Sequence, residues 1–116
     1  MTPAKLDLTV YQGATFRKSF QWLTGVPATP VNLTGYDIRM MIRSSVVDAA
    51  CMASLTLGDG ITITDAEAGK FEVYMSPVQT AGFSKKTAVY DIEFAIGPDV
   101  DRVVEGDISV SFEVTR

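Results

Sequence analysis

Acidic residues in turns are the first side chains whose type and spacing could do chemistry. They lie in three short stretches: Asp59, Asp65 with Glu67, and Asp99 with Asp101. Oxygen-rich turns can hold calcium, but that ion takes about 6–8 oxygen ligands, and no stretch matches the calcium-binding loop of helix–loop–helix proteins. Aspartate also favours turns because its side chain bonds the nearby backbone. We therefore interpret these residues as turn formers and expect no metal site.

A second carboxylate pair, Asp91 and Glu93, alternates with apolar residues in "AVYDIEFAI". Glycoside hydrolysis needs two carboxyl groups that face each other across the substrate. Neighbours on the same face of one strand do not bracket a substrate in that way. The pair instead indicates a solvated face or a face that meets a partner.

Nucleophilic and metal chemistry lack their usual residues in this chain. There is no histidine, and Cys51 is the only cysteine. The commonest general base and metal ligand are therefore missing, as are Ser-His and Cys-His pairs. No phosphate-binding loop, dinucleotide fingerprint or hydrolase nucleophile elbow appears. We expect a protein that is not an enzyme and has no cofactor, with Cys51 as a small buried apolar residue.

The charge and the lengths of the apolar runs argue against nucleic acid and membranes as partners. The net charge is -4, and the only basic pairs are Arg17-Lys18 and Lys85-Lys86. Nucleic-acid binding needs clustered cations, so we expect none. No apolar run has the length of a signal peptide or a membrane span. We expect synthesis in the cytoplasm without membrane insertion, and the glycosylation sequon at Asn32 then has no function.

The elements that must position any binding residues are predicted to be strands. Apolar and polar residues alternate with a period of two through most of the chain. The apolar phases are Leu6 to Val10, Phe16 to Trp22, Tyr36 to Ile42, Cys51 to Leu57, Phe71 to Met75, Ala88 to Ile96 and Val104 to Val114. Seven to eight such strands predict an all-β domain over residues 1–116, an antiparallel β-sandwich with a small barrel as the competing architecture.

Three local features interrupt the strand pattern. Ser76, Pro77 and Gln79 form a helix-start signature, and Gly82 ends the predicted helix near 77–82. Lys18 falls in the apolar phase of its strand, which predicts a position near the rim or beside a bulge. Gly106 falls in the apolar phase of the last strand and predicts a bend or bulge there.

Candidate contact residues lie on an outer strand face and in the terminal segments. Arg39, Met41 and Arg43 alternate with the core phase of "YDIRMMIR", so they face outward and form a possible interface patch. Strand edges and chain ends can pair with a neighbouring chain. The terminal candidates are Leu6, Leu8 and Val10 at the start and Phe112, Val114 and Arg116 at the end.

Five stretches, in order, resemble a group of small phage and prophage proteins. They are "LDLTVYQGATFRKSFQW", "PVNLTGYDIRMMIRSS", "ITITDAEAGKFEVYMSPVQTAGF", "AVYDIEF" and "RVVEGDISVSFEVTR". Together they cover most of the chain. The group is similar to the N-terminal module of upper baseplate proteins of tailed phages, which attaches receptor-binding parts to the particle. The resemblance carries no catalytic residues.

The resemblance implies an immunoglobulin-like β-sandwich and a place in the virion. No coiled coil or receptor domain follows within this chain, which favours capsid decoration (cement) or a tail or baseplate adaptor. The implied partners are other virion proteins, and a homo-oligomer or symmetric multi-copy assembly is expected. The alternative is a carbohydrate-binding β-sandwich module, which would use exposed aromatic side chains in a groove, with Trp22 and the tyrosines as candidates.

Overall fold

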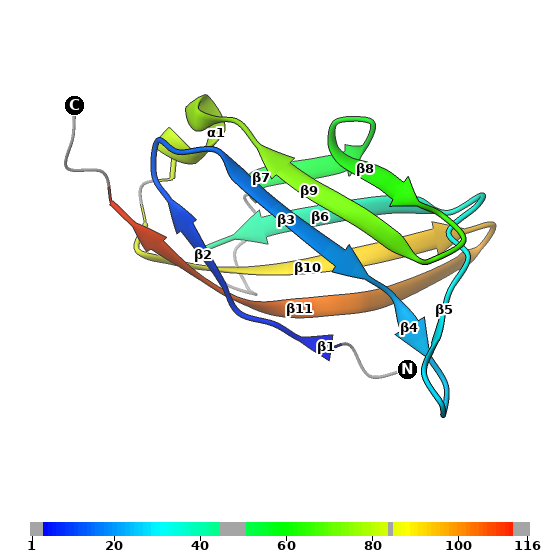
Figure 1. Ribbon diagram of the computed structural model, residues 1–116. Helices are drawn as coiled ribbons and strands as arrows, with labels where there is room; N and C mark the ends of the chain where they lie inside the picture. Colours follow the sequence, from blue (N-terminus) through cyan, green and yellow to red (C-terminus); the bar gives the residue numbers. More distant parts are fainter. Residues whose placement is uncertain (1–3, 45–50, 84, 113–116) are drawn as a thin grey trace.

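The computed structural model describes residues 4–44, 51–83 and 85–112, and these form an all-β fold with one short helix (Figure 1). The elements are β1 Ala4–Lys5, β2 Leu8–Tyr11, β3 Phe16–Gln21, β4 Leu23–Thr24, β5 Thr29–Pro30, β6 Asp37–Arg43, β7 Cys51–Leu57, β8 Gly60–Asp65, β9 Lys70–Met75, α1 Pro77–Ala81, β10 Thr87–Ile96 and β11 Asp99–Ser111. The described strands outnumber the expected seven to eight because the first strand is split into β1 and β2, and because β4 and β5 form a small extra hairpin.

The main sheet is curled into a half-barrel in the order β1-β11-β10-β6-β7-β8-β9-β3, with β2 also paired to β11. Figure 1 shows β3, β8 and β9 on one side of the half-barrel and β6, β10 and β11 on the other. The all-β prediction is confirmed. The expected antiparallel pairing throughout is wrong, because β1 and β2 run parallel to β11, and β7 runs parallel to β8.

The sheet turns from one side to the other at the connection between β7 and β8. The backbone N–H of Thr56 donates to Asp59 O, and the N–H of Asp59 donates to Thr56 O. Gly60 has a φ of 99°, and a Cβ there would lie 2.7 Å from Leu55 Cδ2. A side chain is therefore excluded at this position for both backbone and steric reasons. Asp59, one of the candidate metal ligands, is a turn residue here.

The core lies inside the half-barrel and follows the predicted alternation. Ile38, Met40 and Ile42 of β6 are fully buried. A cluster of aromatic rings joins the two sides of the sheet: Phe94 lies 4.7 Å from Trp22 and 5.2 Å from Phe71, measured between ring centroids. Tilted and edge-on ring pairs of this kind stabilise a core beyond the apolar area that they bury. The core therefore holds β10 against the opposite side of the half-barrel.

The predicted helix is confirmed, with its capping signature. Ser76 accepts the N–H of Gln79, and the Gln79 side chain accepts the N–H of Ser76. Thr80, which is buried, receives a hydrogen bond from the Gly13 N–H and donates one to Ala14 O. The helix thus fastens the turn between β2 and β3.

Candidate protein-binding face

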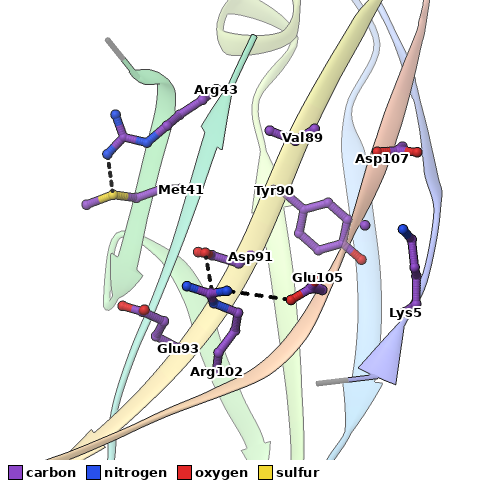
Figure 2. A pocket seen from close by; sticks show the side chains of 11 residues that line it. Lys5, Met41, Arg43, Val89, Tyr90, Asp91, Glu93, Arg102, Glu105 and Asp107 are labelled. Atoms are coloured by element: carbon purple, nitrogen blue, oxygen red, sulfur yellow. Dashed lines mark hydrogen bonds and ion pairs between the residues drawn. The ribbon is translucent and has the colours of Figure 1, made fainter. Parts of the chain in front are cut away.

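The outward side chains of β6, β10 and β11 form a face around a shallow cavity of about 500 Å³ (Figure 2). We call this surface the outer charged face, and its members are Arg39, Met41, Arg43, Val89, Asp91, Glu93, Arg102 and Glu105. The members on β6 and β10, and Glu105 on β11, alternate with buried residues, whereas Arg102 ends a run of exposed residues in β11. The arrangement contains the three outward residues of β6 that the sequence pattern predicted.

Strand register places opposite charges side by side at one end of this face. Glu93 of β10 is the direct cross-strand partner of Arg39 of β6. The Arg39 Nε lies 3.1 Å from Glu93 Oε1, and both side chains are partly exposed. Cross-strand pairs of opposite charge favour this register modestly. Because water still reaches the pair, its contribution to stability is about 1 kcal/mol at most.

A bulge in β11 adds a second set of ion pairs. Ile92 lies opposite Val104, whereas Glu93 lies opposite Arg102, so Val103 is the extra residue. Both Val103 and Val104 are buried, and the phase of the strand changes between them. The change lets Arg102 and Glu105 reach the same outer surface.

Arg102 then bridges two carboxylates across the sheet. Its Nε lies 3.3 Å from Asp91 Oδ2, and its Nη1 lies 3.7 Å from Glu105 Oε1. Asp91 and Glu105 are direct cross-strand partners, so without the guanidinium two like charges would face each other. The arginine therefore organises the centre of the face (Figure 2).

Asp91 is the most perturbed acid of this face. Partial burial raises its pKa above the usual value, and the nearby charges of Glu93 and Glu105 raise it further. Arg102 and Arg43 act in the opposite direction and lower the pKa. Burial and like charges outweigh the two cations, so the ionised carboxylate is held at a cost that a cationic partner group would relieve.

Met41 and Val89 are the apolar members of the face and lie beside its central ion pairs. Met41 is half-buried and lies beside Asp91 in the register of β6 and β10, and Val89 lies beside Arg43. The Arg43 Nη2 lies 3.4 Å from the Met41 sulfur. Methionine adapts its shape to irregular partners, so apolar side chains among these charges suit a protein ligand.

The N-terminal segment forms the border of the cavity at β11. In a regular parallel ladder the Asp107 N–H would donate to Leu6 O; here it donates to Asp7 Oδ1. The Leu6 carbonyl instead accepts a hydrogen bond from the Tyr90 hydroxyl. This exchange of partners separates β1 from β2.

Gly106 makes room for the N-terminal segment where it passes over the sheet, and Tyr90 donates a hydrogen bond to it. A Cβ on Gly106 would lie 2.2 Å from Leu6 O, so the backbone of the segment crosses β11 only where no side chain is present. The predicted bend at Gly106 is in fact this crossing, and the bulge lies three residues earlier. Burial, and secondarily the charge of Asp7, raises the pKa of Tyr90 well above its usual range, so its hydroxyl remains a donor.

The candidate contact residues near the two chain ends differ in how exposed their side chains are. Leu8 is 7% exposed and Val10 is fully buried, so their side chains pack in the chain's own core. These side chains offer no surface to a partner because β2 is a full member of the sheet; a contact through the edge of β2 stays a prediction. Leu6 is 38% exposed and Phe112 is 43% exposed. Val114 and Arg116 lie outside the described residues.

Other candidates from the sequence fall outside the outer charged face. Trp22 is 5% exposed and belongs to the core, so it offers no surface for a sugar ring. Asp65 accepts the N–H of Ala68 as a turn former. Within residues 4–44, 51–83 and 85–112 no cluster of three potential metal ligands occurs. The Cys51 side chain lies outside the part that is described.

Sequence reasoning missed Arg102, Glu105, Asp107 and Lys5, all of which line the cavity. The bulge conceals the outward phase of Arg102, and the parallel pairing of β1 brings Lys5 beside Glu105. The signal that could have revealed the bulge is the doublet Val103-Val104, since two consecutive apolar residues break a period of two.

No family model matches the chain, and no curated protein matches it. In the described part of the chain no helix is long and apolar enough to cross a membrane.

Proposed function

We propose that this chain is a non-catalytic structural protein of a bacteriophage virion, which docks onto other virion proteins as a capsid decoration protein or a tail or baseplate adaptor. The observation that carries the proposal is the outer charged face, where the apolar side chains of Met41 and Val89 lie beside a set of ion pairs. The resemblance of the sequence to phage structural proteins supplies the biological setting.

The charge pattern of this face suits a protein partner. Its arginines and carboxylates are already paired within the sheet, as at Arg39–Glu93 and Asp91–Arg102. A partner of complementary pattern aligns with such a surface, and mismatched partners meet like charges, so the pattern supplies specificity. Met41 and Val89 add apolar area beside these ion pairs, which a partner would bury.

The strand order supports the immunoglobulin-like architecture that belongs to this proposal. On one side of the half-barrel β11, β10, β6 and β7 are neighbours, and on the other β8, β9 and β3 are neighbours. Variable-type immunoglobulin domains extend their G-F-C sheet by a further strand and place B, E and D in the second sheet. The chain order of the strands here corresponds to that pattern.

Attachment of many copies compensates for a small contact area. A face of this size offers less buried area than a stable complex of standard size. Copies arranged on a symmetric particle gain effective concentration from one another when they also touch. The proposed location is therefore the virion, after synthesis in the cytoplasm of the bacterial host.

The proposal is tested by quantitative mass spectrometry of purified particles from a bacterium that carries the gene. We expect the protein in mature particles at a constant number of copies. Complementation with Met41→Glu should lower that number about tenfold, because a charge replaces an apolar side chain of the face. Val78→Glu is the matched control: this apolar residue is exposed on α1, away from the face, and the copy number should not change. Absence of the wild-type protein from mature particles would refute the proposal.

A further inference from the structure

The curled sheet ends in β3 on one side and in the short β1 and β2 on the other, and each of these strands has one edge without a partner strand in the described part of the chain. β3 pairs only with β9, and β2 pairs only with β11. β2 and β3 are consecutive in the chain, yet they are not hydrogen-bonded to each other. An unpaired edge presents backbone donors and acceptors that can pair with another chain, unless side chains prevent it.

The edge at β3 carries charges that oppose pairing. Arg17 and Lys18 lie in the middle of this strand, and both are exposed. Lys18 occupies the inward phase between Phe16 and Phe20, although it remains in solvent. A charge in the inward phase of an edge strand is one of the means by which proteins keep such edges from pairing.

The edge at β2 has no such protection. The strand reads "LTVY", without charge, proline or bulge, and Thr9 and Tyr11 are exposed. Leu6 and Phe112 are also exposed near this edge, and Tyr11 is 62% exposed. Apolar side chains therefore flank a strand edge that remains open.

The hydrogen bonds to β11 decide which backbone groups of β2 are directed outward. The N–H of Leu6 donates to Glu105 O, and the N–H of Gln12 donates to Ser111 O. Groups two residues apart point to the same side of a strand, so Leu8 and Val10 also face β11. The N–H and C=O of Thr9 consequently point away from β11, toward the open edge.

We propose that a second copy of this chain pairs with β2 in antiparallel orientation, with Thr9 of one copy opposite Thr9 of the other. In an antiparallel hydrogen-bonded pair, two opposite residues exchange both of their N–H···O bonds. Thr9 is the residue in the middle of β2 whose two backbone groups are directed outward. A two-fold axis through this pair joins the two sheets into one.

The segment is complementary to itself in this register. Leu8 lies opposite Val10 of the second copy, and both face the core. Asp7 lies opposite Tyr11, so no like charges meet across the axis. A two-fold interface uses the same patch on both copies, which is the condition that this register meets. The exposed Tyr11, Leu6 and Phe112 supply apolar area beside the shared ladder.

This inference does not depend on where the protein works, because it concerns only the edge of β2. The paired segment is short, so the dimer should be weak and should form at concentrations on the order of 100 μM. The first test is molar mass by light scattering or sedimentation over that range. We expect the mass to rise toward twice 12.6 kDa for the wild type.

Matched lysine variants locate the contact. Thr9→Lys places two cations opposite each other, so the mass should stay at one chain. Ser19→Lys adds the same charge in the middle of the β3 edge, and it should dimerise as the wild type does. Trp22 fluorescence verifies that both variants are folded. A wild type that remains monomeric, or a Thr9→Lys variant that dimerises normally, would overturn the proposal.

A cysteine variant tests the register itself. In the background Cys51→Ser, Thr9→Cys places two thiols on the two-fold axis, where Cα atoms about 5.5 Å apart are within the range of a disulfide. Mild oxidation should convert most of this variant into a covalent dimer. Ser19→Cys in the same background is the control and should remain monomeric. Equal cross-linking of the two variants would show that β2 is not the contact edge.

Discussion

The two faces of β10 differ in what they contribute, although they belong to one strand. The inward residues Tyr90, Ile92 and Phe94 are buried and pack in the core. The outward residues Asp91 and Glu93 are partly exposed and form ion pairs with neighbouring strands. Stability therefore arises mainly from the inner face, and the proposed partner contact lies on the outer face. A strand with this division tolerates outward changes that would unfold the protein if they were made inward.

The largest expected effect comes from Phe94→Ala on the inner face. Phe94 contacts the rings of Trp22, Tyr36 and Phe71, and its loss leaves a cavity among them. We expect the free energy of unfolding to fall by about 3–5 kcal/mol. Urea denaturation followed by Trp22 fluorescence measures this change. Phe112→Ala, at an exposed phenylalanine, is the control, and a loss as large there would contradict the division between the faces.

A smaller effect is expected from Gly106→Ala, where the N-terminal segment crosses the sheet. The new Cβ would meet the Leu6 backbone, so the segment has to move. We expect destabilisation by about 1–3 kcal/mol, with faster hydrogen exchange at the Leu6 amide. Gly82→Ala is the control, because Gly82 has an ordinary helical φ of -76°. Unchanged exchange at Leu6 would show that the crossing is not tight.

Tyr90→Phe sharpens the comparison by removing one hydroxyl from the inner face. The change removes the hydrogen bond to Leu6 O and leaves the aromatic packing in place. We expect a loss of about 0.5–1.5 kcal/mol in the free energy of unfolding. Hydrogen exchange should increase for Leu6 and remain constant for Ile42 in the core. Equal changes at both amides would mean that the hydroxyl supports the whole sheet and not the segment alone.

The smallest effect is expected from Asp91→Asn on the outer face. The folded-state pKa of Asp91 lies above its usual value of 3.8, so the folded protein binds this proton more tightly than the unfolded chain does. Stability from this group is therefore present at low pH and is lost as the pH rises through the folded pKa. The variant should have a slightly higher Tm at pH 7 than the wild type.

The same variant should also change the pH dependence of the melting temperature. The advantage of Asp91→Asn should disappear as the pH falls through the folded pKa toward 3.8. Melting curves at a series of pH values from 7 down to 3.8 measure the effect. Thr62→Asn on β8 is the control. If the advantage of the variant grew as the pH fell, folding would lower the pKa of Asp91 and not raise it.

Alternation predicted the inner face well because burial imposes a period of two. The inward residues of β6, β9 and β10 were all recognised in this way, and the helix start was recognised from Ser76, Pro77 and Gln79. The pairing partners could not be predicted, because nothing local in "LTVY" specifies a parallel neighbour one hundred residues later. Leu57 and Ile96 are exposed despite their apolar phase, since each lies at the end of its strand.

Only the part of the candidate site that lies on β6 was predicted. Arg39, Met41 and Arg43 were recognised from the outward phase of β6. Arg102 was not, because the bulge at Val103 shifts its phase, and Lys5 was not, because its neighbour is known only from the fold. The cavity is lined by residues of four strands, so the periodicity of any one strand cannot predict it.

The pairing of β2 with β11 has a consequence for synthesis on the ribosome. Val10 lies beside Val110, so one of the first strands to be made pairs with the last of the described strands. During translation the apolar side chains of Leu8 and Val10 cannot be fully buried until β11 has emerged from the exit tunnel. Sheets that depend on such distant contacts close late, and the nascent chain is exposed to wrong partners until then. Closure of this fold is therefore expected only after β11 has been synthesised.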